Sequence, residues 1–210
     1  MSRRRIVPAV LAALLASTLL AGCKSNVGTA ARVDGTRISE SDVNQYVEPR
    51  GVSSQVAAQA SGANRRVAPR SIVLSILILE QIYEKTLENQ HVRVTDGALT
   101  NYHDDAGSGI LGGQLPSASV DREVNRLVAQ YGLSSAFGHQ LLRMQELKLM
   151  LVDAKRVSTQ AQFDALVKPV ASRVTVTARY GTWDAKNLGL SNEPALPSFI
   201  TAQGGSGGGA

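Results

Sequence analysis

The chain has 210 residues and carries 22 lysines and arginines against 17 aspartates and glutamates, with a single cysteine. Three of the arginines and none of the acids lie in residues 1–22, so the rest of the chain is close to neutral. No dense run of basic residues is present, which argues against nucleic acid as a partner. Aromatic residues are scarce at 4%, whereas Leu, Val, Ala and Ile are plentiful, which favours helices packed on helices over a sheet sandwich.

The N-terminal segment has the layout of a secretory signal peptide, with three arginines, an apolar stretch from Ile6 to Leu20 and small residues before Cys23. Leu20-Ala21-Gly22-Cys23 resembles the bacterial lipobox, which implies a diacylglycerol on the Cys23 thiol and cleavage before it. The alternative is an ordinary signal peptide followed by an incidental free cysteine. The apolar stretch is shorter than the roughly 20 residues of a spanning helix. The sequence therefore predicts a protein held by lipid on the extracytoplasmic side of the cell membrane.

The remaining sequence divides into three parts. We expect a spacer over residues 23–30, a helical domain over 31–184 and a disordered tail over 185–210, which is rich in Pro, Asn and Gly. With Cys23 lipidated, no cysteine is left for a disulfide, so the apolar core must stabilise the domain.

The first part of the domain predicts a strand, a turn and a helix. Residues 31–38 alternate and contain Asp-Gly, which indicates a strand followed by a turn. Ser39 and Asp42 have the spacing of a capping box, so a short helix should run to about Tyr46. Residues 49–69 are rich in Gly, Ser, Ala, Gln and Pro and predict a loop.

The strongest predicted helix covers residues 70–89, and it is apolar nearly all round, as buried helices are. The alternative is that part of its apolar face lines a groove for unfolded chains. Four further helices are expected, over residues 96–104 after the N-cap Thr95, 120–130, 134–155 and 159–170, with Pro169 at the end of the last. Between the first two of these, residues 107–119 contain four glycines and a proline and predict a flexible loop.

Residues 174–180 are the best predicted strand of the chain. A single strand leaves its backbone groups unpaired, so we expect Ala31–Asp34 to pair with Val174–Arg179 and close the domain. The predicted fold class is therefore mainly α, with a small two-stranded sheet that joins the N- and C-terminal ends of the domain.

This order of parts resembles the N-terminal chaperone domain of the SurA and PrsA family. The resemblance rests on three segments over roughly residues 31–184: the opening segment 31–43, the junction Val92-Arg93-Val94-Thr95-Asp96 and the closing segment Val176–Trp183. It implies a helical module that binds unfolded or newly exported polypeptides. The chain departs from the family because the stretch after Trp183 is too short for a parvulin prolyl-isomerase domain.

The sequence offers little for catalysis, and we expect no enzyme, cofactor or metal. His103-Asp104-Asp105 contains metal-binding residue types, but beside a glycine-rich segment it predicts a solvated helix end. His139 predicts a partly buried structural residue. Asp184 has no partner acid, and Trp183 before it predicts packing.

Two functions remain open at this point. One is a lipid-anchored, chaperone-like module that holds polypeptides in an apolar groove. The other is a structural or adaptor lipoprotein with a closed core that docks one specific envelope protein.

Overall fold

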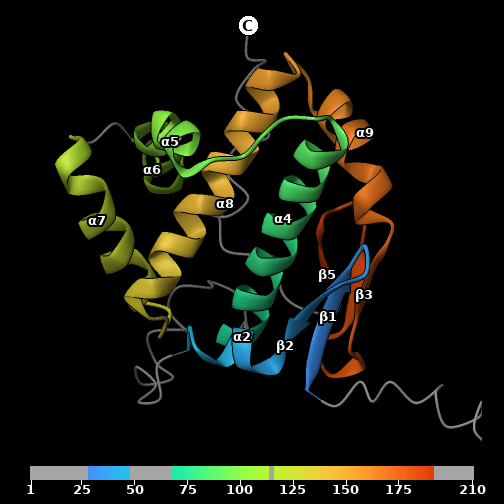
Figure 1. Ribbon diagram of the computed structural model, residues 1–210. Coiled ribbons are helices and arrows are strands. Elements are labelled where there is room, and N and C mark those ends of the chain that lie inside the picture. Colours follow the sequence, from blue (N-terminus) through green and yellow to red (C-terminus); the bar gives the residue numbers. More distant parts are fainter. Residues whose placement is uncertain (1–27, 48–67, 114–115, 192–210) are drawn as a thin grey trace, which may run out of the picture.

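The computed structural model describes residues 28–47, 68–113 and 116–191 (Figure 1). Its helices are α2 (Glu40–Asn44), α4 (Pro69–Asn89), α5 (Asp96–Leu99), α6 (His103–Leu111), α7 (Ser117–Ala129), α8 (Ser135–Ala154) and α9 (Gln160–Ala171), with short 3-10 turns η2 (Thr100–Tyr102) and η3 (Ala178–Tyr180). Its strands are β1 (Thr29–Val33), β2 (Thr36–Ser39), β3 (Val174–Val176), β4 (Thr182–Asp184) and β5 (Gly189–Ser191). The mainly helical class with a small antiparallel sheet is confirmed.

The main sheet has the order β2-β1-β3. β1 and β2 form a hairpin whose turn residues Asp34 and Gly35 have φ values of 47° and 84°, as a tight hairpin turn of this kind requires. β1 also pairs antiparallel with β3, and Ala31 lies opposite Val176. The predicted pairing of the two ends of the domain is therefore confirmed, and the hairpin adds a third strand that the sequence did not predict.

The strand predicted over residues 174–180 is too long, because β3 ends at Val176 and the chain continues through η3 into β4. The prediction of a disordered tail is also wrong for residues 185–191, because β4 and β5 form an antiparallel hairpin there, with Trp183 opposite Leu190. The backbone N–H groups of Lys186 and Asn187 donate to the Asp184 carboxylate at 2.9 and 3.2 Å and close the turn. Residues 192–210 lie outside the described residues.

Two helices begin with a reciprocal cap. At α2 the Ser39 N–H donates to Asp42 Oδ2 at 2.6 Å, and the Asp42 N–H donates to Ser39 Oγ at 3.1 Å. The predicted capping box is therefore confirmed, although α2 ends at Asn44 rather than near Tyr46. Thr159 and Gln162 form the second capping box at the start of α9.

The two long helices, α4 and α8, run side by side through the centre of the domain in Figure 1, and we call them the central pair. Every residue from Ile72 to Leu79 in α4 is at most 8% exposed. On α8 the large side chains of Phe137, Leu141, Met144, Leu147 and Leu151 are buried as well. The prediction of a core helix is confirmed, and the apolar face of α4 lines no open groove.

The flexible loop predicted over residues 107–119 is wrong for most of its length. α6 runs through Gly107 to Leu111, and α7 begins at Ser117, three residues earlier than predicted. A Cβ atom at Gly107 would lie 2.2 Å from Val120 Cγ1, so the glycine is needed for close packing of α6 against α7. The helix predicted over residues 96–104 is divided among α5, η2 and the first turn of α6.

Candidate functional site

Cys23, the predicted lipidation site, lies outside the described residues, as do residues 1–22 and most of the loop predicted over 49–69. None of the helices in the described part of the chain combines the length and apolar character needed to span a bilayer.

Two of the three histidines, His103 and His139, lie near acidic side chains, and the third, His91, is exposed. His103, at the start of α6, places Nδ1 2.9 Å from Glu146 Oε1 and Nε2 3.7 Å from Asp121 Oδ2. His139 Nδ1 lies 3.7 Å from the other oxygen of Asp121, so these side chains link α6, α7 and α8. The side chain of His139 is 67% exposed, which corrects the prediction of a partly buried residue, because its position on α8 faces solvent. His91 is exposed after the end of α4.

Asp104 and Asp105 are exposed in the first turn of α6, as expected for a solvated helix end. Asp104 accepts a hydrogen bond from the hydroxyl of Ser117 at the start of α7. Within residues 28–47, 68–113 and 116–191, no group of three or more His, Cys, Asp or Glu side chains is arranged to hold a metal ion.

The most enclosed polar cluster joins the two helices of the central pair. Glu80 on α4 is 7% exposed and accepts hydrogen bonds from Arg143 Nε at 3.0 Å and from the Gln140 side-chain amide. The Tyr46 hydroxyl donates to Gln140 Oε1 at 3.1 Å, which ties the segment after α2 to the same cluster. The cluster fills the helix interface, so it orients α4, α8 and the segment after α2 rather than offering a binding surface.

The same cluster contains a carboxyl group with a strongly shifted pKa. Burial raises the pKa of Glu80 to about 7; Arg143 opposes this shift, and the neighbouring Glu84 adds to it. Arg143 also lies 3.6 Å from Glu84 and 3.4 Å from Asp96, so its charge is shared among three carboxylates. Glu80 is therefore poised to change its protonation state near neutral pH.

Trp183 and Asp184 are structural. Trp183 Nε1 donates to the backbone carbonyl of Ala171 at 3.1 Å, which fastens β4 to the end of α9. Trp183 also packs against the hydrophobic core, which confirms its predicted packing role. Asp184 also accepts a hydrogen bond from Asn187 Nδ2 at 2.6 Å, and the hydrogen bonds from Asn187 and Lys186 lower its pKa. Asp184 therefore acts as an ionised acceptor that fixes the β4–β5 turn.

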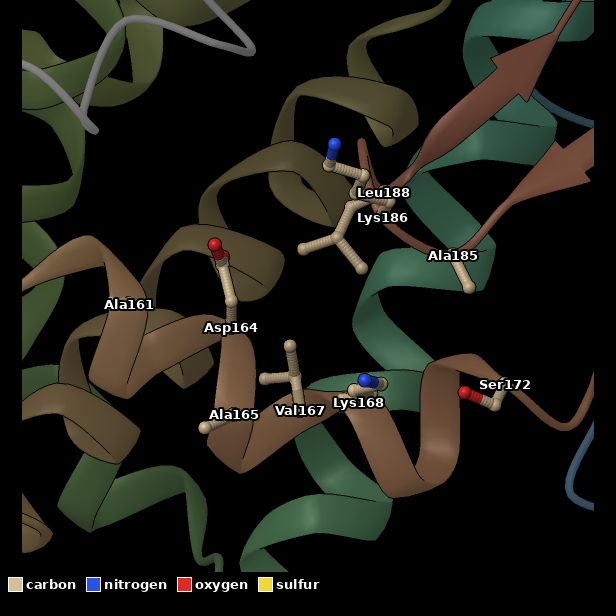
Figure 2. Close-up of a pocket in the computed structure, with 9 residues that line it drawn as sticks. All are labelled: Ala161, Asp164, Ala165, Val167, Lys168, Ser172, Ala185, Lys186 and Leu188. Carbon is tan, nitrogen blue, oxygen red and sulfur yellow. The ribbon is translucent and has the colours of Figure 1, made fainter.

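A pocket of about 590 Å³ lies between α9 and the β4–β5 turn (Figure 2). It is lined by Ala161, Asp164, Ala165, Val167, Lys168 and Ser172 from α9 and the residue after it, and by Ala185, Lys186 and Leu188 from the turn. Figure 2 shows the side chains of Leu188 and Val167 facing each other across the opening. We call α9 and the β4–β5 hairpin together the α9 corner. The volume of the pocket is within the range of sites that hold small molecules or a few side chains.

This pocket is not predicted from the sequence, because composition assigns residues 185–191 to the tail. The signal was present in the pattern from Asp184 to Leu190, where turn-forming Asp, Asn and Gly are interleaved with apolar Leu188 and Leu190. Composition outweighed this pattern in the prediction, because the residues that follow are rich in Pro, Ser and Gly.

In comparisons with known proteins, no protein family, no curated protein and no solved structure matches the chain. The function is therefore argued from the residues and the geometry of this chain alone.

Proposed function

We propose that the protein is a lipoprotein anchored through Cys23 on the extracytoplasmic side of the cell membrane. Its folded domain would serve there as a chaperone-like, polypeptide-binding module without a prolyl-isomerase domain. The signal peptide layout and the lipobox-like residues 20–23 support the anchor. The order of segments, which resembles the SurA and PrsA chaperone domain, supports the module, and the resemblance alone suggests exported polypeptides as clients.

The observation that carries the proposal is the pocket of the α9 corner. Its centre is apolar, with Val167 and Leu188 on opposite sides, and its opening is bordered by charged side chains. Such a site suits an apolar side chain of an extended polypeptide whose backbone stays in water. The central pair is buried, so the proposed binding surface is this corner rather than the face of α4 or α8.

A second candidate function is that of a structural or adaptor lipoprotein that docks one specific envelope protein. The buried central pair favours it, because a closed core leaves no long apolar groove on α4 for unfolded chains. Selectivity separates the two functions: a chaperone-like module binds several unrelated unfolded chains, and an adaptor binds one folded partner.

The anchor is tested by mass spectrometry of the membrane fraction. We expect an N-terminal Cys23 that carries a diacylglyceryl group, and we expect a Cys23→Ser protein to leave the membrane fraction. A mature wild-type protein with an unmodified Cys23 thiol would contradict the proposal.

The binding function is tested with residues 23–210 carrying Cys23→Ser, by light scattering of an unrelated protein that is unfolding thermally. We expect aggregation to be suppressed without ATP and without prolyl-isomerase activity. The binding should be weak, since the client loses chain entropy for a small apolar contact. High salt should weaken it by no more than about tenfold, because apolar contact accounts for the rest of the binding. No suppression at any ratio would favour the adaptor function.

A further inference from the structure

We propose that the pocket of the α9 corner recognises a polypeptide segment in which an apolar side chain stands next to carboxylates. This inference rests on the proposed function and names the client chemistry of the site. Three features of the corner carry it: a strained apolar residue, a positive rim and a fixed hairpin.

The strained residue is Leu188, which has a φ of +49° in the β4–β5 turn. L-residues with side chains seldom adopt this conformation, which Asn and Gly tolerate much better. Asn187 and Gly189 stand on either side of Leu188, yet the leucine occupies the strained position and faces Val167 across the pocket. Backbone strain that holds an apolar side chain beside an open pocket is typical of binding sites.

The rim of the pocket has a net positive charge, because its lining contains two lysines and one aspartate. Lys168 and Lys186 line the pocket, and neither forms an ion pair with a carboxylate within the described part of the chain. The one acid in the lining, Asp164, is held by Gln160, whose Nε2 donates to Asp164 Oδ1 at 2.6 Å. Both lysines are exposed, and although the Lys186 charge also acts on Asp184, the net positive charge of the rim complements carboxylates on either side of a buried apolar group.

The hairpin that carries Leu188 and Lys186 is fixed to α9. Trp183 binds the Ala171 carbonyl, and Asp184 closes the turn through Lys186 and Asn187. Both walls of the pocket are thus set before a ligand arrives, which reduces the entropy lost on binding. A polypeptide fits better than a small free anion, because an open pocket of about 590 Å³ has room for an apolar side chain together with its flanking residues.

The test uses fluorescence anisotropy of labelled twelve-residue Gly/Ser peptides that differ only in three central residues. A Glu-Leu-Glu peptide should bind the Cys23→Ser protein about threefold to tenfold more tightly than a Gln-Leu-Gln peptide, and this advantage should vanish at 500 mM NaCl. A Glu-Ser-Glu peptide should bind about tenfold more weakly than the Glu-Leu-Glu peptide, since it lacks the apolar contact.

Three variants locate the site. Lys168→Gln combined with Lys186→Gln should remove the preference for Glu-Leu-Glu over Gln-Leu-Gln. Leu188→Asn should weaken both peptides about equally while the domain melts at the same or a higher temperature, because Asn accepts the backbone conformation. Lys155→Gln combined with Arg93→Gln, which also removes two positive charges but outside the pocket lining, is the matched control and should bind as wild type.

Other outcomes overturn the inference in distinguishable ways. If the peptides bind but the pocket variants change nothing, the binding function survives and the site is elsewhere. If laurate displaces the Glu-Leu-Glu peptide while Gln-Leu-Gln binds equally well, the pocket takes a lipid anion. If no peptide binds and no client is protected, the proposed function fails together with the inference.

Discussion

The central pair and the α9 corner differ in how far their apolar side chains are buried. In the central pair, residues such as Leu74 and Leu147 are fully buried, and the enclosed acids Glu80 and Glu146 are both hydrogen-bonded. In the α9 corner, Leu188 is only half-buried and its backbone is strained. Buried side chains of the first kind stabilise the fold. A half-buried side chain on a strained backbone contributes less to stability, which is why the corner is the better candidate for binding.

The sharpest way to break this comparison is to truncate one leucine in each region. Leu74→Ala should lower the free energy of unfolding by about 2–5 kcal/mol, because it removes buried surface and leaves a cavity. Leu188→Ala should cost less than about 1 kcal/mol, as substitutions of half-exposed residues do. Urea unfolding of both variants measures the difference. Equal losses would mean that Leu188 is a core residue and that the corner is closed.

The second prediction concerns the contact between α6 and α7, and tests whether these helices pack as tightly as the central pair. Gly107→Ala should lower the free energy of unfolding by about 1–3 kcal/mol, because its Cβ would collide with Val120. The Gly107→Ala, Val120→Ala double variant should be more stable than the sum of the single effects predicts, since the smaller residue removes the collision. Additive losses in thermal or urea unfolding would show that the two helices are packed loosely.

The third prediction concerns Glu80, a buried acid on α4 of the central pair. The pKa of Glu80 is about 7 in the folded state against a usual 4.5, so the folded chain holds the proton at pH values where the unfolded chain has released it. The Glu80 contribution to stability is thus favourable at low pH and is lost as pH rises from about 4.5 to about 7.

Glu80→Gln keeps the shape and removes this titration. Between pH 5 and pH 7, the free energy of unfolding of wild type relative to Glu80→Gln should fall by about 1–2 kcal/mol. Urea unfolding across this range measures it, and Glu123→Gln, at a more exposed acid on α7, is the matched control. A difference that stays constant with pH would show that Glu80 is ionised throughout.

The sequence predicts best where one local rule dominates. Ser39 and Asp42 cap α2 because their spacing suits a capping box, and residues 72–79 of α4 are buried because no polar face interrupts them. The pairing of β1 with β3 was predicted from the need to satisfy backbone groups. Each of these conclusions depends on residues close together in the sequence or on one obligatory pairing.

Prediction failed where a distant contact decides the structure. The sequence around Gly107 predicts a loop. In the structure Gly107 lies in α6, where the lack of a side chain lets Val120 of α7 pack against it. The pocket needs α9 and Leu188 on facing walls, and no local pattern shows that residues far apart in the chain meet there. The turn at Asp184 was not predicted either, because the polar composition of the following residues favoured a disordered tail.

The place of β1 between β2 and β3 has a mechanical consequence. If Cys23 carries the proposed lipid, the tether enters the domain through the middle strand of the sheet, where a pull along the chain must shear two rows of backbone hydrogen bonds at once. Five residues separate Cys23 from Thr29. Fully extended, they reach about 20 Å, so the domain would work within a short, firmly held distance of the bilayer surface.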